Sequence, residues 1–291
     1  MTYSLIIGDR AYSSWSLRAW LLFEHFGLPY EARLVDFRAD GPLADQMPEF
    51  APAITVPTVK TPDDVIVTDS LAIAEELASR HPEAGLWPAD PLARATARSL
   101  AAEMHSSFGA LRSECPMNLR SAYQGTDPSD AVLADLSRIQ TLWQHARSVC
   151  RSDSPWLCGP YSAADAFYAP VAARIAGYDL PVDAAACAYV AAHLEDPAFR
   201  RWRAMGLVRG ETLPWYAKPF ETTDWPGPPP LSARAVKGGH PENATCPYSG
   251  KPTTHMLELD GRIFGFCNAF CRDKTAADPE AWPAFKALLK A

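Results

Sequence analysis

The sequence predicts an α/β domain, then an all-α domain, then a small α+β module. Short apolar segments alternate with helix-like periodicity in the first eighty residues, and a long alanine- and leucine-rich stretch with few strand signals follows. A proline-rich stretch separates these regions from a final hairpin pattern flanked by cysteines. The predicted boundaries are residues 1–82, residues 88–213, a linker at 214–240 and the module at 241–291.

Composition and charge argue against two classes of binding partner, nucleic acids and membranes. The chain has 291 residues, of which 48% are hydrophobic and 21% charged, and its formal net charge is −7. Basic residues form no stripe, so we expect no nucleic-acid partner. The sequence contains no basic signal region and no apolar run long enough to cross a bilayer, so we expect a cytoplasmic protein with no membrane partner.

Seven cysteines are present, and four of them show no motif spacing. In a cytosolic chain such residues are usually small, buried, reduced side chains. The four are Cys115, Cys150, Cys158 and Cys187.

The first domain is predicted element by element. Apolar runs bounded by turn residues indicate strands, and apolar residues three to four positions apart indicate helices. The order is a strand at 5–7, a helix that ends before Gly27, a strand at 32–35, hairpin strands at 58–60 and 65–67, and a helix from Asp69 to just before Pro82. Tyr12-Ser13-Ser14 therefore lies at a helix N-terminus.

This order resembles a thioredoxin fold. The segment Tyr12-Ser13-Ser14-Trp15-Ser16-Leu17-Arg18 resembles the serine-type signature of glutathione transferases and is closest to the zeta class. Trp15 stands where the zeta class has cysteine. Thr55-Val56-Pro57 stands where the fold places a cis-proline, and Asp69-Ser70 where transferases place the acid–serine pair that holds the γ-glutamyl group.

The resemblance implies that glutathione is the co-substrate and that its thiolate is the reactive species. A free thiol has a pKa of ~8.5. To lower this pKa by about two units, the site must stabilise the thiolate over the thiol by roughly 2.7 kcal/mol. A hydrogen bond to a charged acceptor contributes ~1.5–3 kcal/mol and a helix N-terminus ~0.3–1. Ser13 is the expected donor, with Ser14 as a secondary contact; the alternative is that the serines only cap the helix.

The middle of the chain is predicted to be helical over residues 92–111, 131–149 and 184–194. Ser162 and Asp165 resemble the capping box of the transferase helical domain, a structural feature. The resemblance extends over roughly residues 3–213.

Three residues are candidates for binding the electrophile. His105, Phe108 and Arg112 are three to four positions apart, so on one helix they would share a face. Arg112 could hold a substrate carboxylate, and Phe108 could line an apolar pocket. Core packing with a solvated arginine is the alternative.

The last fifty residues contain three clustered cysteines. Cys246 precedes a hairpin centred on Asp260-Gly261, and Cys267 and Cys271 follow it. This layout resembles treble-clef-like zinc modules of the TRASH and YHS groups, in which a second cysteine stands where this chain has Ser249. His255 is the expected fourth ligand, with Asp273 or water as alternatives. Three reduced cysteines in a packed hairpin are the alternative to a metal site.

Together these features predict a glutathione S-transferase-like enzyme that acts on a small electrophile as a homodimer. Ser13 and Ser14 would orient and ionise the thiol, and four residues would bind the rest of glutathione, namely Val56, Pro57, Asp69 and Ser70. One alternative is a non-catalytic glutathione-binding or protein-interaction member of the fold. Another is a maleylacetoacetate-type isomerase.

Overall fold

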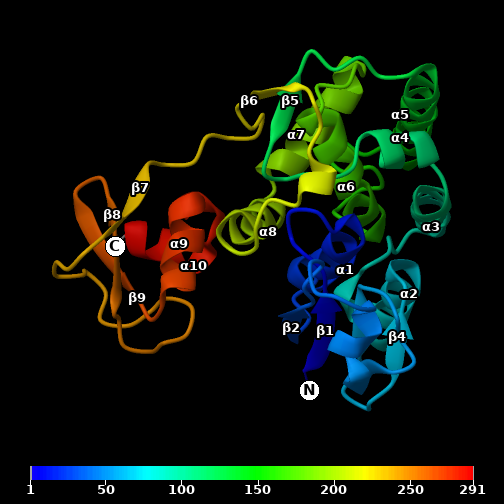
Figure 1. Ribbon diagram of the computed structural model, residues 1–291. Helices are drawn as coiled ribbons and strands as arrows, with labels where there is room; N and C mark the ends of the chain where they lie inside the picture. Colours follow the sequence, from blue (N-terminus) through cyan, green and yellow to red (C-terminus); the bar gives the residue numbers. More distant parts are fainter. Residues whose placement is uncertain (1, 291) are drawn as a thin grey trace. The chain divides into compact units, whose positions relative to one another are not determined.

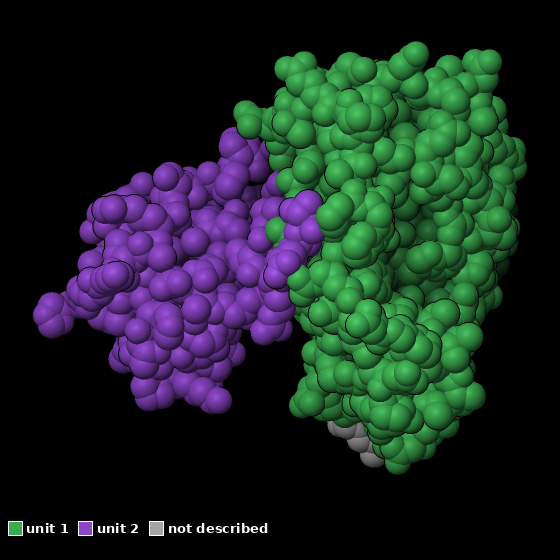
Figure 2. Space-filling model, viewed as in Figure 1, with its two compact units in different colours: residues 1–194, 213–226 green, residues 195–212, 227–291 purple. Residues whose placement is uncertain are grey.

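The computed structural model describes residues 2–290, and Figure 1 shows its elements. The chain forms two compact units, coloured separately in Figure 2. Unit 1 comprises residues 1–194 and 213–226, and unit 2 comprises residues 195–212 and 227–291. Residues 1 and 291, which begin the first predicted domain and end the last, lie outside the described residues. None of the helices described has the length and apolar character needed to cross a membrane.

Unit 1 begins with a four-stranded sheet in the order β2-β1-β3-β4. Its strands are β1 (Tyr3–Ile7), β2 (Tyr30–Leu34), β3 (Thr58–Lys60) and β4 (Ile66–Thr68), and its helices are α1 (Ser14–His25) and α2 (Ser70–Arg80). β1 is parallel to β2 and antiparallel to β3, which is antiparallel to β4. β1 is central because its apolar side chains are buried. The predicted thioredoxin-like order is confirmed.

The rest of unit 1 is mainly helical, as predicted. The helices are α3 (Pro91–Ser106), α4 (Gly109–Glu114), α5 (Asp130–Cys150), α6 (Ala163–Gly177) and α7 (Ala184–Glu195). Nearly every residue of α6 is buried, and the helix packs against both α1 and α3. Its many alanines allow this, because small side chains let neighbouring helices approach on several sides.

One local prediction for unit 1 was wrong, and one element was not predicted. The continuous helix expected over residues 92–111 is broken after Ser106, because Phe108 adopts a left-handed conformation (φ 62°) that an α-helix does not accommodate. A short two-stranded sheet was not predicted: β5 (Ala122–Gln124) pairs antiparallel with β6 (Glu221–Thr223). β6 lies within the predicted linker.

Unit 2 is built around an antiparallel sheet in the order β7-β8-β9. Its elements are α8 (Pro197–Val208), β7 (Ala233–Val236), β8 (His255–Leu259), β9 (Arg262–Phe266), α9 (Ala269–Ala277) and α10 (Pro283–Leu289). The predicted hairpin is confirmed, because β8 and β9 pair around Asp260-Gly261, both of which have positive φ. The core includes Leu257, Leu259, Phe264, Phe266 and Phe285.

The two units divide the chain differently from the predicted boundaries. Residues 195–212, expected within the second domain, pack in unit 2, where α8 contacts α9. Arg200 on α8 makes two hydrogen bonds to the Asp278 carboxylate, at 2.8 and 2.7 Å. The proline-rich stretch supplies β7, which pairs with β8, as well as β6. Backbone pairing over long sequence distances is not visible in local composition.

The predicted capping box begins α6. The buried Asp165 carboxylate accepts hydrogen bonds from the Ser162 amide (2.9 Å) and hydroxyl (3.0 Å). It also accepts from the Leu157 amide (3.1 Å) and the Tyr189 hydroxyl (2.9 Å). Burial raises the pKa of Asp165, and these four donors oppose that shift. One carboxylate therefore joins α6, α7 and the loop before α6.

Asp165→Ala should lower the free energy of unfolding by about 3 kcal/mol or more, because four buried donors lose their acceptor. Ser162→Ala, which removes only the capping hydroxyl, should cost about 1 kcal/mol. Urea unfolding followed by circular dichroism measures both, with Asp165→Asn as the variant of matched size. An unchanged urea midpoint for Asp165→Ala would show that the box does not stabilise the helix.

Candidate functional site

Ser13 is the N-cap of α1. Its Oγ accepts a hydrogen bond from the Ser16 amide (3.3 Å) and donates one to Ser16 Oγ (2.8 Å). Ser16 Oγ also accepts from the Gly8 amide (2.9 Å), which ties the end of β1 to the first turn of the helix. The Ser13 hydroxyl is therefore engaged within its own loop.

The next residue, Ser14, is hydrogen-bonded to a side chain of α6. Its side chain is buried, and its Oγ accepts a hydrogen bond from Nη2 of Arg174 on α6 (3.4 Å). Arg174 also donates to the carbonyls of Cys115 (2.9 Å) and Pro170 (3.1 Å). Within residues 2–290, no group accepts the Ser14 hydroxyl proton. That hydroxyl can donate to an additional acceptor at the helix N-terminus.

Two guanidinium groups lie close to the Trp15 ring. The Arg18 carbon Cζ is 4.4 Å from the centre of the indole ring, and the Arg112 Cζ is 4.6 Å from it. Arg18 also lies 5.2 Å from the centre of the Phe167 ring. Its Nε and Nη1 are buried and have no hydrogen-bond partner among the described residues. Aromatic faces offset part of the cost of burying these cations.

The region around the α1 N-terminus carries excess positive charge. Burial lowers the pKa of Arg18 to about 9, with further lowering by Arg174 and Arg112. Burial, and then Arg112, lowers the pKa of Arg174 to about 10. Both groups stay protonated at neutral pH. Asp69 is the carboxylate that opposes the shift at Arg18. Because three guanidinium groups face one carboxylate here, the region favours the binding of an anion.

Asp69 and Ser70 begin α2, as predicted. Asp69 has positive φ (73°), and its Oδ1 accepts hydrogen bonds from the amides of Leu71 (2.7 Å) and Ala72 (3.4 Å). Its Oδ2 lies 3.2 Å from Nε2 of His105. Ser70 Oγ is buried and has no hydrogen-bond partner in the described part of the chain. An unpartnered buried hydroxyl at a helix N-terminus suits a bound carboxylate.

The Val56-Pro57 peptide bond is cis, as the resemblance implied. Val56 packs against a buried cluster that includes Ile6, Met47 and Phe50. This packing fixes the segment that leads into β3.

The three predicted electrophile-binding residues do not share a helix face. His105 is on α3, Phe108 is the buried N-cap of α4, and Arg112 is on α4. Arg112 Nη1 donates to the carbonyls of His105 (3.2 Å) and Ser107 (3.3 Å) and so caps the end of α3. His105 also packs edge-on against Trp15, with the ring centres 5.2 Å apart. Burial lowers the pKa of His105. Because the helix is broken, His105 and Arg112 contact Trp15 from two different helices, α3 and α4.

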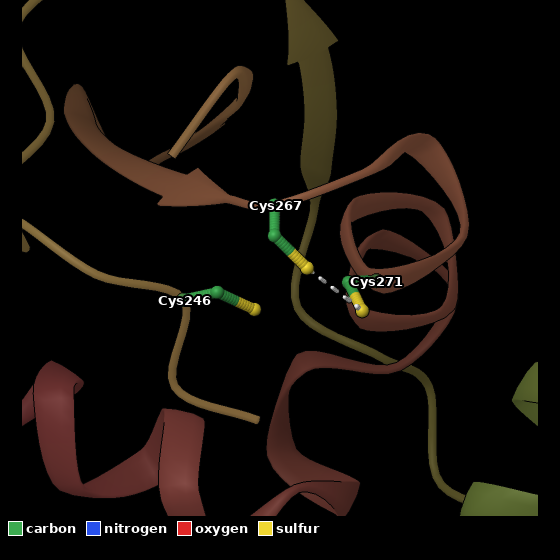
Figure 3. Close-up of side chains that lie close together, drawn as sticks. All are labelled: Cys246, Cys267 and Cys271. Carbon is green, nitrogen blue, oxygen red and sulfur yellow. Dashed lines mark hydrogen bonds between the residues drawn. The ribbon is translucent and has the colours of Figure 1, made fainter. Parts of the chain in front are cut away.

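The three predicted cysteines of unit 2 come together. Figure 3 shows the sulfur atoms of Cys246, Cys267 and Cys271 pointing toward one another. All three Sγ atoms lie within 4.8 Å of one another, and those of Cys267 and Cys271 are 3.9 Å apart. Cys246 lies in a turn closed by a hydrogen bond from the Gly250 amide to its carbonyl (2.9 Å). Cys267 follows β9, and Cys271 is in the first turn of α9.

The predicted fourth ligand, His255, is not part of this cluster. Among residues 2–290, the three cysteines alone form a group with ligand spacing. His255 Nδ1 is hydrogen-bonded to Thr254 Oγ1 (2.9 Å), and Asp273 pairs with Arg272. Ser249 is the polar side chain beside the sulfurs, and its Oγ donates to Cys267 Sγ (3.2 Å). His255 was placed by its position on the hairpin, which does not determine where its ring points.

Two positioning residues were missed in the sequence. Arg174 is a lone charge in the apolar run Val171-Ala172-Ala173-Arg174-Ile175-Ala176, which was a visible signal for a buried functional cation. Ser249 was noted only as a missing cysteine. Its contact with Cys267 depends on the hairpin and had no local signal.

Comparisons with known proteins agree with this geometry. Residues 12–80 match the family described as glutathione S-transferase, N-terminal domain. A probable maleylacetoacetate isomerase from Caenorhabditis elegans is 36% identical over 91 residues, which are 31% of this chain and 41% of that protein. The match thus spans about two fifths of the curated relative.

Solved structures extend the likeness through the helical domain. A glutathione transferase homologue from Burkholderia gl BGR1, with bound glutathione, is 22% identical, with 71% of this chain and 98% of that chain covered and a TM-score of 0.54. Glutathione transferase Omega 1C from Trametes versicolor is 17% identical, with 69% and 90% covered and a TM-score of 0.53. The chain contains the glutathione transferase fold. These identities show the fold alone.

The two neighbouring serines should respond differently to mutation. Ser13→Ala should lower the free energy of unfolding by about 1 kcal/mol through loss of the N-cap, and Ser13→Asp should restore most of it. Ser14→Ala, which leaves the cap intact, should change stability much less. Chemical denaturation of the three variants measures this. Equal losses for Ser13→Ala and Ser13→Asp would contradict a capping role.

Proposed function

We propose that this protein is a glutathione-dependent transferase or isomerase in which Ser14 donates the hydrogen bond that stabilises the glutathione thiolate. The Ser14 hydroxyl carries this proposal. It lies at the N-terminus of α1, its oxygen accepts from Arg174, and its proton is free to donate. Ser13, which the sequence favoured for this role, is occupied as the N-cap.

These groups can supply the free energy needed to ionise the glutathione thiol. One hydrogen bond to a charged acceptor, with the helix N-terminus, supplies the roughly 2.7 kcal/mol that lowers a thiol pKa by about two units. The guanidinium groups of Arg18 and Arg174 add positive potential in a buried setting. No general base is required, because the serine donates a hydrogen bond and does not act as a nucleophile.

The other end of glutathione would bind at the start of α2. The unpartnered Ser70 hydroxyl and the α2 N-terminus suit the γ-glutamyl carboxylate, and Asp69 suits the ammonium group. The backbone beside cis-Pro57, at Val56, would bind the cysteinyl part. The packing of Val56 against the buried cluster holds this segment in place.

Ser14→Ala should lower turnover ten- to a hundred-fold, because about 1.5–3 kcal/mol of anion stabilisation is lost. The pKa of the bound thiol, followed by thiolate absorbance, should rise in parallel, and the affinity for glutathione should fall less. Ser13→Asn, which keeps the cap without adding a charge, is the matched control. Wild-type thiol ionisation in Ser14→Ala would contradict the assignment.

An anionic electrophile is the substrate class that we favour. Arg112 and His105 meet at Trp15, where positive charge exceeds negative charge. The maleylacetoacetate isomerase relative favours an isomerase as the second candidate function. Comparing turnover of a carboxylated electrophile with that of its uncharged amide would test the preference. A non-catalytic glutathione-binding protein would be retained on a glutathione column and would turn over neither compound.

We also propose that Cys246, Cys267 and Cys271 hold a structural zinc ion in a treble-clef-like module. The Cys267–Cys271 sulfur separation of 3.9 Å is close to the edge of a tetrahedron with zinc–sulfur bonds of ~2.3 Å, about 3.8 Å. A module with so small a core gains stability from such a metal.

The protein prepared without chelators should contain about one zinc per chain. Chelation should expose new proteolytic sites after His240, because the metal joins the Cys246 turn to β9 and α9, and should leave glutathione turnover nearly intact. Elemental analysis and limited proteolysis measure these effects. Cys187→Ser, which removes a distant cysteine, is the control for Cys271→Ser. If the protein contains no zinc, the metal site is refuted and the three cysteines are reduced side chains in a packed hairpin.

A further inference from the structure

The cysteine cluster of unit 2 supplies three sulfur ligands, whereas structural zinc sites normally have four protein ligands. The two other ligands expected from the sequence are engaged elsewhere: His255 with Thr254, and Asp273 with Arg272. Among residues 2–290, no histidine or carboxylate therefore closes the fourth direction.

The open side of the cluster lies toward Ser249 and Cys267. Cys246 is 1% exposed and Cys271 is 9% exposed, whereas Cys267 is half-buried and Ser249 is exposed. Ser249 Oγ contacts Cys267 Sγ at 3.2 Å, so the serine lies beside the sulfurs at the solvent boundary. This side of the cluster is therefore the one nearest to solvent.

Ser249 is a poor fourth ligand for a thiophilic metal. A neutral hydroxyl binds soft or borderline cations more weakly than a thiolate does. Its proton is also used, in the hydrogen bond to Cys267. The Asn268 side-chain amide donates to the same sulfur (3.3 Å).

We propose that the three-cysteine site is open and that a metal held there binds the thiol of a small external molecule, such as glutathione, as its fourth ligand. In this step the S–H bond of the external thiol breaks, a metal–sulfur bond forms, and the proton passes to the buffer. A coordinated thiol is deprotonated, so the fourth ligand would be a thiolate. This inference rests on the proposed metal site and is independent of the glutathione site of unit 1.

The test uses the full chain, reduced, freed of metal and loaded with one equivalent of cadmium, which reports its sulfur ligands by absorbance and by ¹¹³Cd NMR. Glutathione added to this protein should raise the cadmium–sulfur charge-transfer absorbance by about one third, because the ligands increase from three thiolates to four. The ¹¹³Cd resonance should move to the four-sulfur range. S-methylglutathione, which has no free thiol, should change neither signal.

Ser249→Cys provides the matched control. Its new thiol should give the four-sulfur signals without any added glutathione, and glutathione should then have no effect. Ser249→Ala should respond as the wild type does.

The outcomes separate the two proposals. Wild-type protein that binds cadmium but ignores glutathione would show a closed site and overturn this inference while the metal site stands. Loss of cadmium from the protein to glutathione, seen after gel filtration, would also overturn it. If the protein does not bind cadmium at all, both the proposed metal site and the proposed external ligand are refuted.

Discussion

The buried guanidinium of Arg174 is the interaction on which the site in unit 1 depends. It extends from α6, whose own position is fixed by the Asp165 capping box, to Ser14 at the start of α1 and to the Cys115 carbonyl. A buried cation must be surrounded by acceptors, and here the acceptors come from different parts of the chain. The orientation of the Ser14 hydroxyl is therefore set by the helical part of unit 1 and not only by the α1 loop.

Positive charge around Trp15 gives this arrangement its chemical character. Arg18 and Arg112 lie on the indole ring, and the nearby Asp69 carboxylate is shared with His105. Burial of Arg18 beside a second guanidinium is unfavourable, and Asp69 offsets only part of that free energy. A thiolate or carboxylate ligand would recover part of that cost, so the same charges that reduce stability favour binding.

Unit 2 contains a small sheet with few core residues, so other contacts must contribute to its stability. Phenylalanines of β9 pack on α10, and the Arg200 ion pair ties α8 to the segment after α9. Three cysteines then connect a turn, the end of a strand and a helix start. A metal at that point would join elements that share little apolar surface, and the polar Ser249 would leave one side of it accessible.

The sequence by itself determined the strand and helix order of the first eighty residues and the β8–β9 hairpin, because these depend on local spacing and turn chemistry. The cis-proline and the capping box were expected from the resemblance to glutathione transferases, and the structure contains both. The sequence also identified the three cysteines that gather. Only the tertiary structure decided that Ser13 caps while Ser14 faces Arg174, that α8 packs with unit 2, and that His255 lies outside the cysteine cluster. These depend on side-chain direction and on contacts between distant segments, which periodicity does not encode.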